Sequence, residues 1–163
     1  MAVRHQLIRR PPHALWEVLR DTSRYCEWVV GTHSTSPGEG IWPMPGSTLH
    51  YTVRLGPKEF EGSTVVRRYD PPHALELEAR SGPLGTARIA LDIRAWGEHT
   101  LVIVDEHPLR GVGGALHNGA VDFLLQQRHR RMLGRLATVV EESAPEGGPS
   151  RSGSDRSGDA VDV

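Results

Sequence analysis

This sequence of 163 residues has only one cysteine, no long apolar run and no excess of charge of one sign. The single cysteine, Cys26, cannot form a disulfide within the chain. No segment approaches the roughly 20 apolar residues that a membrane-spanning helix needs. Residues 1–6 alternate polar and apolar side chains, where a secretory signal peptide would have an apolar run. We therefore expect a cytoplasmic protein without a transmembrane segment.

The balance of charge bears on the partners of the protein. The chain has 19 basic and 20 acidic side chains and a formal net charge of -1. Domains that bind nucleic acid usually carry a marked positive charge, so we expect no nucleic-acid partner. The length, with 37% hydrophobic residues, suits one domain with one core. No feature of the sequence fixes the oligomeric state.

The last part of the chain differs in composition from the rest. Serine, glycine and proline dominate residues 143–163, where Val161 and Val163 are the only sizeable apolar side chains. Such a segment cannot bury enough apolar surface to offset the entropy lost on ordering. We therefore predict a folded domain over residues 1–142 and a disordered tail over residues 143–163.

Proline and glycine clusters divide the folded part into elements. Pro11 and Pro12 end a first strand, and Pro12 suits the first turn of a short helix. A second short helix follows, bearing Trp28. The segments after it have the composition of strands. The predicted strands are Val3–Arg10, Thr32–Ser36, Thr48–Leu55, Phe60–Tyr69, Ala74–Arg80, Thr86–Ala95 and Thr100–His107, and the closing helix is Asn118–Glu142.

Alternating side chains indicate which faces of these elements are buried. Residues 48–55 and 86–95 are apolar at every second position, which is typical of an antiparallel sheet covered on one side. Arg128 and Arg135 fall within the apolar stripe of the closing helix, which consists of Val121, Leu124, Leu125, Met132, Leu136 and Val139. No strand–helix–strand alternation follows the early helices, which excludes a doubly wound fold. The pattern predicts an α+β fold.

Several segments resemble one family in order and spacing. They are Pro11–Asp21 with its central Trp16, Trp28, Pro45–Ser47, Phe60–Gly62, Thr100–Pro108 and Arg128–Leu136. Together these segments make residues 1–142 similar to the START-like (helix-grip, SRPBCC) superfamily, in its branch labelled polyketide cyclase/dehydrase and lipid transport. The resemblance implies a curved, seven-stranded antiparallel sheet wrapped around a long C-terminal helix. It also implies a cavity between sheet and helix for lipids, polyketides or similar molecules.

The resemblance does not imply one reaction, because members of the superfamily include carriers, cyclases and dehydratases. Two functions follow as hypotheses. The first is the binding or carrying of a small hydrophobic ligand. The second is a cyclase, aromatase or dehydratase that acts on a poly-β-carbonyl chain in the same cavity. No cofactor is expected for either, and whether the protein is an enzyme stays open.

We expect the side chains that line this cavity to come from both sheet and helix. They are Tyr51, Val53, Ile89, Leu91, Glu106, Val121, Leu125, Arg128 and Met132. Trp42 and Met44 lie in the long loop of residues 37–46. They would either form an apolar lid over the pocket or close the end of the sheet.

Three residues are candidates for chemistry. Arg128 would hold a carboxylate or enolate of a ligand, or would pack its stem and leave its head in water or on a carboxylate. Glu106 would pair with Arg128 or act as a general base, and His107 is another group that can move protons. The hydrophobic pattern leaves the direction of Glu106 and His107 open, because residues 101–104 are all apolar. The resemblance favours Glu106 facing the helix.

Other motifs carry no site. The nine histidines have no short spacing typical of metal ligands, so no metal is expected. Residues 111–114, Gly-Val-Gly-Gly, follow a predicted strand, but the sixth position of a dinucleotide-binding pattern is Leu116 instead of glycine. Nucleotide binding is therefore not expected either.

Overall fold

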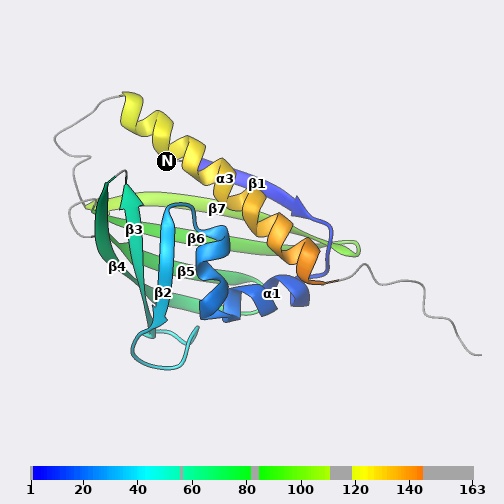
Figure 1. Cartoon of the computed structure of the whole chain (residues 1–163). Coiled ribbons are helices and arrows are strands. Elements are labelled where there is room, and N and C mark those ends of the chain that lie inside the picture. The colour runs from blue at the N-terminus through cyan, green and yellow to red at the C-terminus, as the bar shows by residue number, and fades with distance from the viewer. Residues whose placement is uncertain (1, 56, 82–84, 111–118, 145–163) are drawn as a thin grey trace, which may run out of the picture.

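The computed structural model describes residues 2–55, 57–81, 85–110 and 119–144 (Figure 1). For residues 2, 55, 107–110 and 119–129, the description is limited to the backbone. The elements are β1 (Ala2–Ile8), α1 (Pro12–Arg20), η1 (Thr22–Arg24), α2 (Tyr25–Trp28), β2 (Thr32–Pro37), β3 (Thr48–Leu55), β4 (Lys58–Asp70), β5 (Ala74–Arg80), β6 (Thr86–Trp96), β7 (His99–Arg110) and α3 (Gly119–Ser143).

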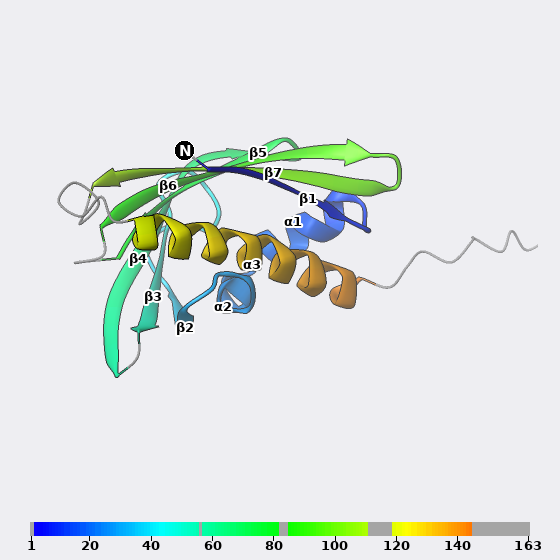
Figure 2. The ribbon, with the colours of Figure 1, turned by 90° about the horizontal axis from the view of Figure 1, so that it is seen from above.

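Within the described residues, seven strands form one antiparallel sheet in the order β1-β7-β6-β5-β4-β3-β2. Consecutive strands from β2 to β7 pair as a meander, and β1 joins the sheet beside β7. The sheet curves, and α3 lies along its concave side next to β1, with α1 and α2 also on that side (Figure 2). The predicted α+β helix-grip fold is confirmed.

The core lies where the concave face of the sheet meets the helices. In α1, the wholly buried side chains include Leu15, Trp16 and Leu19. On the sheet they include Leu49, Val66, Leu75, Leu77, Leu91, Ile93, Val102 and Val104. Leu49, Leu91 and Ile93 match the faces that alternation predicted for residues 48–55 and 86–95, because a side chain at every second position of a strand points to the same face.

The C-terminal part of α3 packs on this core through Met132, Leu133, Leu136, Ala137 and Val140. The predicted stripe was therefore right at positions 132 and 136. Val139 also packs against the core, although it is only partly buried. The fully buried neighbours Leu133, Ala137 and Val140 lie on the other flank of Leu136, whereas the flank of Val139 carries the exposed Arg135.

The end of α3 is tied to the end of β1. Arg10 donates hydrogen bonds to two carbonyl oxygens there: Nη2 to Glu141, at 2.8 Å, and Nε to Ala144. The backbone N–H of Arg9 donates to Oε1 of Glu141 at 2.9 Å. The last carbonyls of a helix have no partner within the helix, so a basic side chain that binds them acts as a cap.

Replacing Arg10 with alanine should remove this cap and lower the free energy of unfolding by about 1 to 2 kcal/mol. Arg9→Ala is the matched control, because the exposed Arg9 contacts Glu141 only through its backbone N–H. Urea unfolding of the two variants checks the prediction. Equal losses in the two variants would contradict it.

Candidate ligand-binding site

The register of the strands defines two rows of side chains on the concave face. One row runs Leu75, Leu91, Val104 and Arg4 across strands β5, β6, β7 and β1. The next row runs Leu77, Ile89, Glu106 and Ala2. Directly opposed residues in an antiparallel pair project from the same face of the sheet. Because Ile89 is buried in the core, Glu106 lies on the concave face.

Along these rows, burial falls toward the end of the sheet where β7 finishes and α3 begins (Figure 2). Leu75, Leu77 and Leu91 are at most 2% exposed. Beyond them the concave positions carry small or polar side chains that are only half-buried: Ala79, Ala87, Glu106 and Arg4. The sheet therefore presents less side-chain volume toward α3 at this end.

An aromatic cluster lies at the part of the concave face formed by β3 and β4. The ring of Tyr25 contacts those of Trp28, Trp42 and Tyr51, with centroid distances of 5.3, 6.4 and 5.9 Å. Tyr51 lies flat over Gly62 of the neighbouring strand, where an added Cβ would come within 2.5 Å of the ring. The cluster joins α2 to β3 and β4 and fixes the position of Tyr51.

Most polar atoms of this cluster have hydrogen-bond partners outside it. The hydroxyl of Tyr51 hydrogen-bonds Oγ of Ser81 at 2.8 Å, and that of Tyr25 hydrogen-bonds Oγ1 of Thr64 at 2.8 Å. The exception is Trp28, which is 2% exposed and whose indole Nε1 has no hydrogen-bond partner among the described residues. A buried donor without an acceptor costs free energy and calls for an explanation such as a bound molecule.

The residues predicted to line the pocket fall into two groups. Tyr51, Val53, Ile89, Leu91 and Met132 are buried in the core, and Glu106 lies half-buried beside them on the concave face. The side chains of Val121, Leu125, Arg128 and His107 lie outside the described residues. The structure therefore brings the sheet half of the predicted set to one surface, and the roles assigned to the set stay predictions.

The two residues predicted to form a lid differ in their surroundings. Trp42 is partly buried, packs edge-on against Tyr25 and donates its indole N–H to the carbonyl oxygen of Leu19 at 3.0 Å. Met44 is 50% exposed. Trp42 therefore packs against α1 and α2, and both roles, lid and closure of the sheet end, stay predictions.

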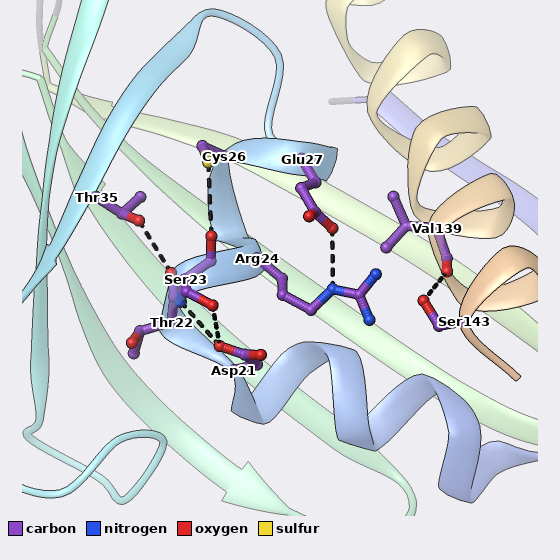
Figure 3. A network of polar contacts seen from close by, with 9 residues as sticks. All are labelled: Asp21, Thr22, Ser23, Arg24, Cys26, Glu27, Thr35, Val139 and Ser143. Carbon is purple, nitrogen blue, oxygen red and sulfur yellow. Dashed lines mark hydrogen bonds and ion pairs between the residues drawn. The ribbon is translucent and has the colours of Figure 1, made fainter.

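A groove is present on the outer side of α3, where that helix faces α2. Its volume is about 510 Å³, and it is lined by Glu27, Arg131, Gly134, Arg135, Thr138 and Val139. Figure 3 shows the side chain of Glu27 on α2 directed toward Arg24, with Val139 on the facing helix. The ion pair between Glu27 and Arg24 has a length of 2.9 Å. Arg135, one of the two arginines in the predicted stripe, is exposed in this groove. Its side chain therefore stays in water.

The convex face of the sheet carries ion pairs instead of a site. Arg67 and Arg80 both bind Glu78 at 2.8 Å and hold the pKa of its carboxyl below its usual range. Arg54 likewise lowers the pKa of Glu59. In the described part of the chain, no group of three or more metal-ligating side chains comes together. No helix there is long and apolar enough to cross a bilayer.

Comparison with known proteins decides the family. Residues 2–141 match the family described as polyketide cyclase/dehydrase and lipid transport. This chain belongs to that family. No curated protein matches this chain. The assignment agrees with the resemblance carried by the helix and strand motifs of the sequence.

Solved structures support the same fold for this member of the family. A START superfamily protein from Mycobacterium smegmatis has a TM-score of 0.73 at 13% identity, over 88% of this chain and 98% of its own. Zhui aromatase/cyclase from Streptomyces sp. R1128 has a TM-score of 0.67 at 13% identity, over 90% and 96%. Ara h 8.0201 has a TM-score of 0.68 at 14% identity, over 85% and 95%. Likeness at such identities shows the fold alone.

Sequence reasoning missed two polar side chains of this family member that the structure places in or beside the core. Trp28 appeared only as a packing residue, and Arg4 was not singled out. The unpaired Nε1 of Trp28 depends on tertiary contacts, and no sequence signal predicts it. Arg4 shares its side of β1 with Ile8, which is 1% exposed, so the alternation around Ile8 was the available signal.

Proposed function

We propose that this protein binds and carries a small hydrophobic ligand between the concave face of the sheet and the N-terminal part of α3. The observation that carries the proposal is the change along the concave face. Large buried aliphatic residues give way to the small, half-buried Ala79 and Ala87. The C-terminal part of α3 packs directly on the core, so the ligand would lie beneath residues 119–131.

The unpaired indole of Trp28 supports the same function. A ligand oxygen that accepts a hydrogen bond from Nε1 would remove the cost of this buried donor. The hydroxyls of Tyr25 and Tyr51 already have partners, so the apolar surface supplies most of the affinity. Each 100 Å² of apolar ligand surface removed from water contributes roughly 2.5 kcal/mol, before the entropy lost on association is subtracted.

One observation favours a cyclase, aromatase or dehydratase as the second candidate. Glu106 lies on the concave face, where a carboxyl can act as a general base on a bound poly-β-carbonyl chain. That chemistry needs a second group, and Arg128 and His107 are the remaining candidates. The carrier hypothesis does not depend on either of them. We also place the protein in the cytoplasm, as the single cysteine suggests.

The experiment is a titration with N-phenyl-1-naphthylamine, a neutral apolar fluorophore, combined with a substitution that fills the proposed space. Ala87→Leu should weaken the binding of the fluorophore by roughly 10-fold, or about 1.4 kcal/mol, and leave the stability of the protein unchanged. Ala90→Leu on the convex side of the same strand is the control and should change neither. Native mass spectrometry of the purified protein should also detect a bound apolar molecule.

Two results would contradict the proposal. One is the absence of any fluorophore binding by the folded protein. The other is a loss of about 1 to 3 kcal/mol of stability in Ala87→Leu, which is typical of overpacking and would mean that side chains already fill this region.

A further inference from the structure

The edge strand β1 presents an arginine to the concave face. Arg4 is directly opposite Val104, at the end of the row formed by Leu75, Leu91 and Val104. Its neighbour Val3 is 58% exposed on the other face of the strand. The helix α3 packs along β1 and runs beside it in both views of the ribbon (Figures 1 and 2). A cation therefore lies between an aliphatic surface and the gripped helix.

Within the described part of the chain, the buried Nε of Arg4 has no hydrogen-bond partner. The arginines on strands β3 to β6 differ from Arg4, since each of them is within ion-pair distance of a carboxylate: Arg54, Arg67, Arg68, Arg80, Arg88 and Arg94. A buried donor of a charged group without an acceptor is costly, and an anion bound from outside would supply that acceptor.

We infer that Arg4 binds the carboxylate of an amphipathic ligand, an inference that rests on the proposed carrier function. A guanidinium matches a carboxylate through two parallel N–H···O bonds and is more weakly hydrated than a lysine ammonium. The apolar part of the ligand would extend from Arg4 toward Ala87 and Ala79, where the concave face has small side chains. The ligand class is thus a long-chain carboxylic acid.

The test compares dodecanoate with dodecanol, which has the same chain and no charge, as competitors for N-phenyl-1-naphthylamine. The protein should bind dodecanoate at least 10-fold more tightly than dodecanol. Arg4→Gln should weaken dodecanoate by 10-fold or more and leave dodecanol and the fluorophore unchanged, while Arg4→Lys should retain part of the preference. Arg9→Gln, which removes an exposed arginine five residues along the chain, should retain all of it.

The outcomes separate this inference from the function on which it rests. If the fluorophore binds but dodecanoate has no advantage over dodecanol, the Arg4 site is overturned and the carrier function stands. The site is also overturned if Arg4→Gln weakens all three molecules equally and lowers the melting temperature, because Arg4 would then be structural. If the fluorophore does not bind at all, the carrier function fails, and the Arg4 site fails with it.

Discussion

Replacing Leu136 with alanine is expected to lower the free energy of unfolding by about 2 to 5 kcal/mol. Leu136 is fully buried at the centre of the face that α3 lays on the core, with Met132 and Val140 one turn away on either side. Truncation to alanine leaves a cavity at this contact, because helix and sheet relax only partly. Denaturant unfolding followed by circular dichroism measures the loss.

The matched control is Arg135→Ala, one residue earlier on the same helix. Arg135 is exposed in the outer groove, so its truncation should change the stability by no more than about 0.5 kcal/mol. Similar losses at positions 135 and 136 would mean that α3 does not rest on the sheet through the face of Leu136. The helix-grip packing would then be wrong for this chain.

The sheet and its covered face could be predicted from the sequence because they depend on local patterns. Leu49, Tyr51 and Val53 alternate with polar residues, and all three are buried. Proline and glycine clusters marked the strand ends to within a few residues. Some strands continue past the apolar pattern: β4 begins at Lys58 instead of Phe60, and β7 runs to Arg110 instead of His107.

The predictions that needed tertiary contacts were open or wrong. Residues 101–104 are apolar on both faces, so only the register with Ile89 gave the direction of Glu106. The strand β1 shows the same difficulty. Its apolar Val3 and Leu7 are 58% and 39% exposed, while Arg4 lies on the covered side. Pairing with β7 and the burial of Ile8 fix the orientation of this strand. They outweigh the preference of the apolar Val3 and Leu7 for the covered side.

The candidate site was predictable only in part for a related reason. Sequence patterns identify which side chains share a surface, and that gave Tyr51, Ile89 and Leu91. They do not identify which polar atoms lack a partner, because pairing depends on residues far apart in the chain. Tyr51 and Ser81 form a hydrogen bond across 30 positions, whereas Nε1 of Trp28 and Nε of Arg4 have no hydrogen-bond partner in the part of the chain that the structure describes.

Gly62→Ala is expected to cost about 2 to 3 kcal/mol, although alanine is normally favoured over glycine in a strand. The added Cβ would lie 2.5 Å from Cε2 of Tyr51 and 2.8 Å from its hydroxyl oxygen. The ring cannot move aside easily, because it stacks on Tyr25 and its hydroxyl is bonded to Ser81. Loss of the near-ultraviolet circular dichroism of the cluster, together with the drop in stability, measures the effect.

A double mutant and a second glycine make this prediction specific to the contact between Gly62 and Tyr51. The double mutant Gly62→Ala/Tyr51→Leu lacks the ring that the new Cβ would contact. Its loss of stability should therefore be smaller, by at least about 1 kcal/mol, than the sum of the losses in the two single mutants. Gly134→Ala in α3 has open space around its new Cβ and should stabilise the protein by about 0.5 to 1 kcal/mol. Additive costs at positions 62 and 51 would mean that the aromatic cluster does not rest on the backbone of β4, and that Tyr51 is free to take another position on the concave face.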